Sequence, residues 1–270
     1  MDSVALPLAA AAFDATATVF DERFGAWRSV AAQRAAVRRA LLAAFPIGSR
    51  LLEIGGGTGE DARWLALRGR EVLVTDASPA MISIAAEKLT GCALPSPRVL
   101  AAERLGAFAD ERESAAAPPF DGAFSNFAAL NCVTDLRCTG PALARLVRRG
   151  GRVLLVLFGA CAPGEVVTQL ARGDARAAFR RFARGPVAAR LGGRDFTIRY
   201  HRSRDVEAAL APWFRLVSRR GIGVFVPPSA AEPWISAHAR LLSTLAMLDR
   251  LASRPLAAFG DHVLYELVRT

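Results

Sequence analysis

The chain has 270 residues, of which 52% are hydrophobic and 22% are charged, so it can bury a sizeable core and is not expected to be disordered. No apolar run approaches the roughly 18 residues that a membrane-spanning helix needs, and the N-terminus lacks the basic residues that open a signal peptide. A soluble cytoplasmic protein without a membrane partner is therefore expected.

The formal net charge of +10 would suit a nucleic-acid partner. However, Lys88 is the only lysine, and such a preference for arginine is typical of a compositional bias of the genome. The arginines are also spread along the chain, with no long basic run interleaved with aromatic residues. Nucleic acid is therefore not expected to be the main partner.

The four cysteines, Cys92, Cys132, Cys138 and Cys161, form no C-x-x-C pair. No histidine stands at zinc-finger spacing from them, so no metal site is predicted. Reduced thiols are expected for a chain of this kind.

Strand-like and helix-like segments alternate through the first part of the chain. Helical patterns occupy residues 60–69 and 78–89, and the second begins with Ser78 as N-cap and Pro79 at the first helical position. This alternation predicts a parallel sheet with helices on both faces. The predicted strands, which are apolar and rich in β-branched residues, are residues 50–55, 71–76, 98–102, 120–127 and 151–158.

Two further strands and two insertions are predicted in the C-terminal part. Residues 214–228 read as two strand halves joined at Gly221, and residues 261–268 read as a last strand. Residues 160–202 and 227–260 are interpreted as insertions around these strands.

The second insertion contains a predicted helix. Ser229 and Glu232 have the spacing of a capping box, and apolar residues follow at helical intervals towards Leu251. The first insertion is rich in Arg and Gly and has no clean pattern.

A glycine cluster at residues 55–59 joins the first strand to the next helix. Glycine permits close approach of a ligand to the backbone, and the helix offers free N–H groups. A P-loop would need Gly-Lys-Ser/Thr, but Gly59 is followed by Glu60 and Asp61. The spacing G-x-G-x-G also differs from the dinucleotide fingerprint. Since two carboxylates would repel a pyrophosphate, a cationic ligand without phosphates fits better.

The stretch "LLEIGGGTG" resembles motif I of class I S-adenosylmethionine-dependent methyltransferases of the small-molecule type. "VLVTDAS", "SPAM", "FDGAFSNFAALN" and "RRGGRVLLVLF" resemble later motifs of this family, in the right order. The resemblance covers residues 13–158 well. It implies a Rossmann-like, seven-stranded, mostly parallel sheet with the last strand antiparallel and helices on both faces. It also implies S-adenosyl-L-methionine as the cofactor.

The same resemblance implies which residues hold the methyl donor. Asp76 would hold both ribose hydroxyls, Met81 would pack near the adenine, and Glu103 is the nearest adenine-side acid. Glu53 would support the glycine loop or the donor's amino group, with a hydrogen bond to loop amides as the alternative. Leu130 and Asn131 would begin the substrate side. The predicted donor site comprises Phe20, Glu53, Gly55, Gly56, Gly57, Gly59, Asp76, Ala77, Met81, Glu103, Asn126 and Phe127.

Residues 1–45 resemble the helical lid of small-molecule methyltransferases, leaving residues 46–270 as the core. Phe20-Asp21 occupies the place of an aromatic-Asp pair, and an aromatic face near a sulfonium gains from cation–π attraction. Arg34 would pair with the donor carboxylate or, alternatively, lie on a solvated helix face.

The acceptor is predicted mainly from absent motifs. Ser125–Ala128 replaces the Asp/Asn-Pro-Pro-aromatic motif of amino-methylating nucleic-acid enzymes. In-line methyl transfer to the O, N or C atom of a small molecule in bacterial secondary metabolism is therefore expected, by a monomer or homodimer. His262 and His201 are candidate bases, with a structural role as the alternative for each. Candidates for lining the acceptor site, with a place in the core as the alternative for most of them, are Phe179, Phe182, Phe225, Trp234 and Leu241.

Two alternatives remain open at this point. One is a methyltransferase for RNA or protein, which the positive charge would attract. The other is a non-catalytic partner protein that binds S-adenosylmethionine.

Overall fold

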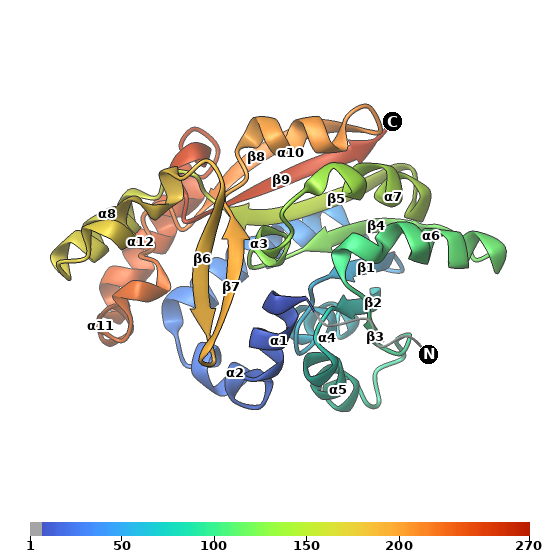
Figure 1. Cartoon of the computed structure of the whole chain (residues 1–270), viewed down its shortest axis with the longest axis horizontal. Helices are drawn as coiled ribbons and strands as arrows, with labels where there is room; N and C mark the ends of the chain where they lie inside the picture. Colours follow the sequence, from blue (N-terminus) through green and yellow to red (C-terminus); the bar gives the residue numbers. More distant parts are fainter. Residues whose placement is uncertain (1–6) are drawn as a thin grey trace.

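A computed structural model describes residues 7–270. One sheet has the strand order β3-β2-β1-β4-β5-β9-β8 (Figure 1). Only β9 in this sheet runs against the others, pairing antiparallel with β5 and with β8. The predicted fold class is therefore confirmed. The strands are β1 (Arg50–Ile54), β2 (Glu71–Asp76), β3 (Arg98–Val99), β4 (Phe120–Ser125), β5 (Val147–Phe158), β8 (Phe214–Ile222) and β9 (His262–Arg269).

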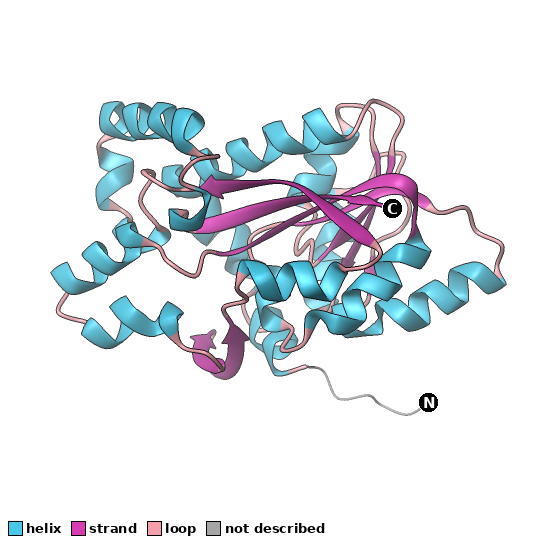
Figure 2. Ribbon diagram, turned by 90° about the horizontal axis from the view of Figure 1, so that it is seen from above, coloured by secondary structure: helices cyan, strands magenta, loops and turns pink. Residues whose placement is uncertain are grey.

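Helices cover both faces of the sheet (Figure 2). Successive strand residues point to opposite faces, so Leu51 of β1 packs in one core layer and Leu52 in the other. The first layer contains α3 (Arg28–Ala44), α4 (Glu60–Ala66) and α5 (Pro79–Lys88). The second contains α6 (Leu105–Ser114), α7 (Thr139–Leu146) and α10 (Ser203–Leu210).

The N-terminal helices α1 (Leu8–Asp14) and α2 (Ala17–Gly25) precede α3 and lie near α5 (Figure 1). The hairpin of β6 (Pro186–Leu191) and β7 (Arg194–Arg199) packs against α1. The rings of Phe13 and Phe196 lie 6.0 Å apart at this contact. The first insertion therefore supports α1, which the sequence pattern did not predict.

The two insertions also form helices at one end of the molecule (Figure 1). The first contributes α8 (Pro163–Ala171), α9 (Ala175–Phe179) and the 3₁₀ turn η4 (Arg180–Phe182). The second contributes α11 (Trp234–Ala237) and α12 (Ala239–Ala252). Short 3₁₀ turns complete the chain: η1 (Ala102–Arg104), η2 (Ala129–Cys132), η3 (Leu136–Cys138), η5 (Ser229–Ala231) and η6 (Ala257–Phe259).

Three local predictions differ from the structure. Residues 214–222 form one continuous strand through Gly221, because both sides of the glycine pair with β9. The third strand is only two residues long. Glu232 does not close a capping box, because its Oε1 accepts hydrogen bonds from the backbone N (3.0 Å) and Oγ (2.6 Å) of Ser29. By contrast, Ser78 caps α5 as predicted, accepting a hydrogen bond from Met81 N at 3.1 Å.

No helix within residues 7–270 is long and apolar enough to cross a membrane.

A buried arginine ties the first insertion to the sheet. Arg181 pairs with Glu165 of α8 and, at 2.5 Å, with Asp261 just before β9. It also donates to the carbonyl oxygens of Gly159 (3.1 Å) and Asp261 (2.6 Å). Asp261 in turn accepts a hydrogen bond from Gln33 of α3 at 3.2 Å. These buried groups therefore satisfy one another across four segments of the chain.

We predict that Arg181→Met lowers the free energy of unfolding by about 3–5 kcal/mol, because it removes the buried cation that Glu165 and Asp261 share. Arg180→Met is the matched control, since Arg180 also pairs with Glu165 but is 42% exposed. Chemical denaturation of both variants measures the difference. Equal stability of the two variants would contradict a central role for Arg181.

Candidate active site

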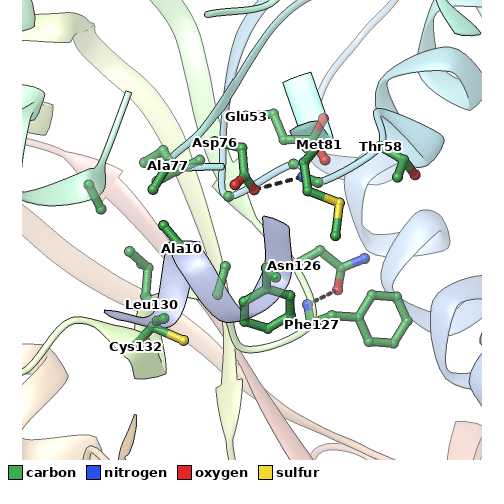
Figure 3. Close-up of a pocket in the computed structure, with 18 of the residues that line it drawn as sticks. Ala10, Glu53, Thr58, Asp76, Ala77, Met81, Asn126, Phe127, Leu130 and Cys132 are labelled. Carbon is green, nitrogen blue, oxygen red and sulfur yellow. Dashed lines mark hydrogen bonds between the residues drawn. The ribbon is translucent and has the colours of Figure 1, made fainter. Parts of the chain in front are cut away.

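One cavity opens at the carboxyl ends of β1, β2 and β4, the position where parallel sheets bind ligands (Figure 3). It gathers nearly all of the predicted donor residues. Gly59 does not line it; this glycine lies at the N-cap of α4 with φ of 75°. The predicted residues that line the cavity are Phe20, Glu53, Gly55, Gly56, Gly57, Asp76, Ala77, Met81, Glu103, Asn126 and Phe127.

The glycine loop has a backbone shape that other residues would not tolerate. Gly55 and Gly57 have φ of 68° and 55°, in the left-handed region. A Cβ on Gly55 would lie 2.3 Å from the Cβ of Ala129, and one on Gly56 would lie 2.8 Å from the carboxyl carbon of Glu53. The loop therefore presents bare backbone to the cavity.

Asp76 connects this loop to the next strand. Its Oδ2 accepts a hydrogen bond from Gly57 N and its Oδ1 accepts one from Ser78 N, both at 2.9 Å. Burial raises the pKa of Asp76, and the backbone hydrogen bonds oppose this shift by favouring the ionised form. Each oxygen keeps acceptor capacity beyond its one protein bond.

Glu53 is a buried carboxyl group without a cationic partner. It is 2% exposed, and its Oε2 has no hydrogen-bond partner in the structure. Burial, followed by the nearby charge of Asp61, raises the pKa of Glu53 well above its usual range. Because Oε2 lies close to Gly56 in the loop, this group is well placed for a ligand that carries positive charge.

Asp61 also lines the cavity, although the sequence analysis did not assign it to the site. Its Oδ1 accepts a hydrogen bond from Arg38 Nε and its Oδ2 accepts one from Asn126 Nδ2, both at 2.7 Å. Arg34 lies 3.7 Å away. The position of Asp61 just after the glycine loop, in the first turn of α4, was the sequence signal that could have identified it as a site residue.

The chain makes an unusual turn after β4. Phe127 and Ala128 have φ of 47° and 60°, which is strained for residues with a side chain. Asn126 stabilises the turn, because its Oδ1 accepts a hydrogen bond from Phe127 N at 2.8 Å. The Arg34 guanidinium lies 4.8 Å from the centre of the Phe127 ring. This turn therefore holds an aromatic ring and an arginine beside the cavity.

Apolar side chains also line the cavity. Met81 and Leu130 are each 1% exposed, and Leu100 and Cys132 line the cavity with them. Burial raises the pKa of Cys132 to about 12, so its thiol stays protonated at neutral pH. Glu103 also lines the cavity and is exposed.

Helices α1 and α2 cover the cavity and bond to its frame. Asp14 accepts hydrogen bonds from Ser78 Oγ and from Ala80 N, both at 2.8 Å. Asp21 accepts one from Thr58 of the glycine loop at 2.7 Å and pairs with Lys88 at 2.5 Å. A further set of aromatic rings, Phe13, Phe20 and Phe24, packs in series along these helices.

The structure does not bring the two candidate histidines into the cavity. His201 is 3% exposed and its Nε2 hydrogen-bonds to the carbonyl oxygen of Val133 at 2.9 Å; burial lowers its pKa, so the ring is neutral. His262 stacks on Phe158 at 5.0 Å and meets the edge of Phe127 at 6.0 Å. Their neighbours Phe127 and Val133 line the cavity, but neither histidine does.

Several predicted substrate-side residues lie elsewhere. Leu130 lines the cavity, but Asn131 bonds to the Arg199 carbonyl (2.6 Å) and to Phe158 N (2.9 Å). The apolar candidates are exposed and outside the cavity: Phe179, Phe182, Phe225, Trp234 and Leu241.

Among residues 7–270, no three His, Cys, Asp or Glu side chains are grouped so that they could hold a metal ion.

Comparison with known proteins gives a consistent assignment. Residues 52–155 match the family model described as "Methyltransferase domain". No curated protein matches the chain.

Three solved structures illustrate the similarity in fold. A putative S-adenosylmethionine-dependent methyltransferase from Listeria monocytogenes is 14% identical (TM-score 0.56), with 86% of this chain and 96% of that chain covered. One from Mesorhizobium loti is 19% identical (TM-score 0.52), with the same coverage. Geranyl diphosphate C-methyltransferase from Streptomyces coelicolor A3(2) is 14% identical (TM-score 0.51), covering 88% and 79%.

The match over residues 52–155 identifies a methyltransferase domain in the chain, and the fold around it is shared with the S-adenosylmethionine-dependent methyltransferase structures described above.

We predict that Glu53→Gln changes how stability depends on pH. The raised pKa means that folded Glu53 keeps a proton which the unfolded chain loses near its ordinary pKa of 4.5. The free energy of unfolding of the natural protein should therefore fall as pH rises above that value, and this fall should shrink in Glu53→Gln. Chemical denaturation between pH 4 and pH 8 measures it.

Glu71→Gln is the matched control, because Glu71 begins the neighbouring strand and is exposed. Its pH profile should follow that of the natural protein. If Glu53→Gln followed the same profile too, Glu53 would not hold the extra proton.

Proposed function

We propose that the cavity binds S-adenosylmethionine and that the enzyme moves its methyl group to an O, N or C atom of a small molecule in bacterial secondary metabolism. The observation that carries the proposal is a bare glycine loop flanked by Asp76 and an unpaired, buried Glu53. This combination favours a ligand with hydroxyls and positive charge over one with phosphates.

Each part of the cavity suits one part of the donor. The free acceptor capacity of Asp76 suits the two ribose hydroxyls. Glu53 and the Asp61–Asn126 pair suit the ammonium group, and Arg34 suits the carboxylate. The apolar lining residues Met81, Leu100, Leu130 and Cys132 suit the adenine, and Glu103 also lines the cavity.

The bound donor supplies an activated methyl group, so the chain's main task is alignment and exclusion of water. Phe20 and Phe127 both line the cavity, where aromatic faces would favour a sulfonium. No histidine lines the cavity within residues 7–270. This favours an acceptor atom that is already nucleophilic or that carries its own base.

A small acceptor is supported by the position of α1 and α2. Both helices line the cavity, and Asp14 and Asp21 bond them to α5 and the glycine loop. In this role residues 1–45 are a lid over the core of residues 46–270. The lid would exclude a large polymer from the cavity. The methyltransferase structure from Streptomyces coelicolor is a complex with the small molecule geranyl diphosphate.

We predict that Asp76→Asn weakens binding of S-adenosylhomocysteine at least about tenfold, or about 1.4 kcal/mol, because a neutral amide accepts fewer hydroxyl bonds than a carboxylate. Asp135→Asn is the control, since Asp135 pairs with Arg137 in the open and lies outside the cavity. Calorimetric titration measures both. Equal affinities would remove Asp76 from the donor site.

A second experiment tests the acceptor class. The enzyme and S-adenosylmethionine are incubated with a low-molecular-mass cell extract, with bulk RNA or with bulk protein, and formation of S-adenosylhomocysteine is measured. We predict turnover with the small-molecule fraction only. Turnover with RNA or protein would reverse the proposed acceptor, and donor binding without turnover in any fraction would indicate a non-catalytic binding protein.

A further inference from the structure

The two insertions expose an apolar surface that the proposed reaction does not use. Residues 163–184 and 229–254 lie at the same end of the molecule in both views (Figures 1 and 2). We call their exposed side chains the insertion surface. Leu251 is 75% exposed, Val167 is 67% and Trp234 is 56%. The exposed large apolar residues of this surface are Val167, Leu170, Phe179, Phe182, Trp234, Leu241, Met247, Leu248 and Leu251.

Helix α12 carries apolar side chains beyond those that it buries. Its inner side packs through Leu242, with Leu245 and Ala246 beside it. Leu241 and Leu248 stand four residues before and three residues after Leu245, so they border this packed side, and Leu251 follows Leu248 by three residues. The packed side of the helix therefore continues into an exposed apolar margin.

In the two segments that form the insertion surface, most acidic residues are buried and most arginines are exposed. Glu165, Glu232 and Asp249 are buried, where they bind Arg181, Ser29 and the backbone N of Phe225. Asp174 is the one acidic residue of these two segments that is exposed, and it caps the backbone of Ala177. The exposed basic residues are Arg172, Arg176, Arg180, Arg184, Arg240, Arg250 and Arg254.

Three kinds of partner can be compared with this pattern. A second copy of the chain would bring the same arginines face to face, which disfavours a symmetric contact. Nucleic acid would use the arginines but leave the leucines, valine and methionine without contacts. An anionic bilayer offers phosphate charges for the arginines and acyl chains for the apolar side chains at the same time.

We propose that the insertion surface binds the face of an anionic phospholipid membrane. Apolar side chains of α8 and α12 enter the headgroup region, and the surrounding arginines contact lipid phosphates. The sequence analysis expected no membrane partner because the chain lacks a spanning segment, but binding at the surface needs none. The proposal is independent of the acceptor.

The test is co-sedimentation of the full-length protein with large unilamellar vesicles. Vesicles of phosphatidylglycerol and phosphatidylcholine are compared with vesicles of phosphatidylcholine alone, at low and high salt. Binding is expected only to the anionic vesicles and should weaken with salt. The double variant Val167→Gln/Leu251→Gln should bind at least about fivefold less.

The matched control is Ile47→Gln/Leu67→Gln. Ile47 and Leu67 are 78% and 68% exposed, as much as the tested pair, but they lie outside the insertion surface. This control should bind vesicles like the natural protein. Circular dichroism and thermal unfolding confirm that both variants are folded.

Two results would overturn the proposal. The first is an absence of vesicle binding, or binding that the Val167/Leu251 variant leaves unchanged. The second is a dimer in vesicle-free solution, seen by light scattering and lost in that variant, which would assign the surface to a second copy of the chain.

Discussion

The hydrogen bond from the backbone of Gly57 to the carboxylate of Asp76 fixes the geometry of the site. It joins the turn after β1 to the end of β2, two strands that are parallel neighbours in the sheet. A carboxylate that is held by backbone N–H groups cannot rotate away, so its remaining acceptor positions point in fixed directions. The left-handed glycines allow the turn to approach closely enough for this bond to form.

The electrostatics around this bond are uneven. Arg34 and Arg38 neutralise Asp61, while the equally buried Glu53 has no cation of its own. The site therefore contains a carboxyl group whose pKa is raised by burial and by its acidic neighbour. A cationic ligand would place a positive charge beside Glu53. The same carboxyl group would therefore strengthen binding and favour cationic ligands over neutral ones.

The strand and helix patterns predicted most elements of the sheet, and the resemblance to a known family supplied most of the residues that line the cavity. Glycine spacing, strand ends and the Ser78 cap are short-range features, and each has one low-energy structure. Tertiary contacts decided the rest. Glu232 was predicted to cap its own helix but binds Ser29, more than two hundred residues away in the chain. His201 and His262 were candidates by residue type alone, and packing against Val133 and Phe158 keeps both out of the cavity.

Lys88 has a consequence that follows from the arginine-rich composition. It is the only lysine of the chain, and its amine is bonded to Asp21 of α2 and to Thr58 of the glycine loop. Apart from the α-amino group, an acylating reagent thus meets one amine in the whole protein. Acylation there would remove the positive charge that pairs with Asp21, so a single modification would break the ion pair between α5 and α2.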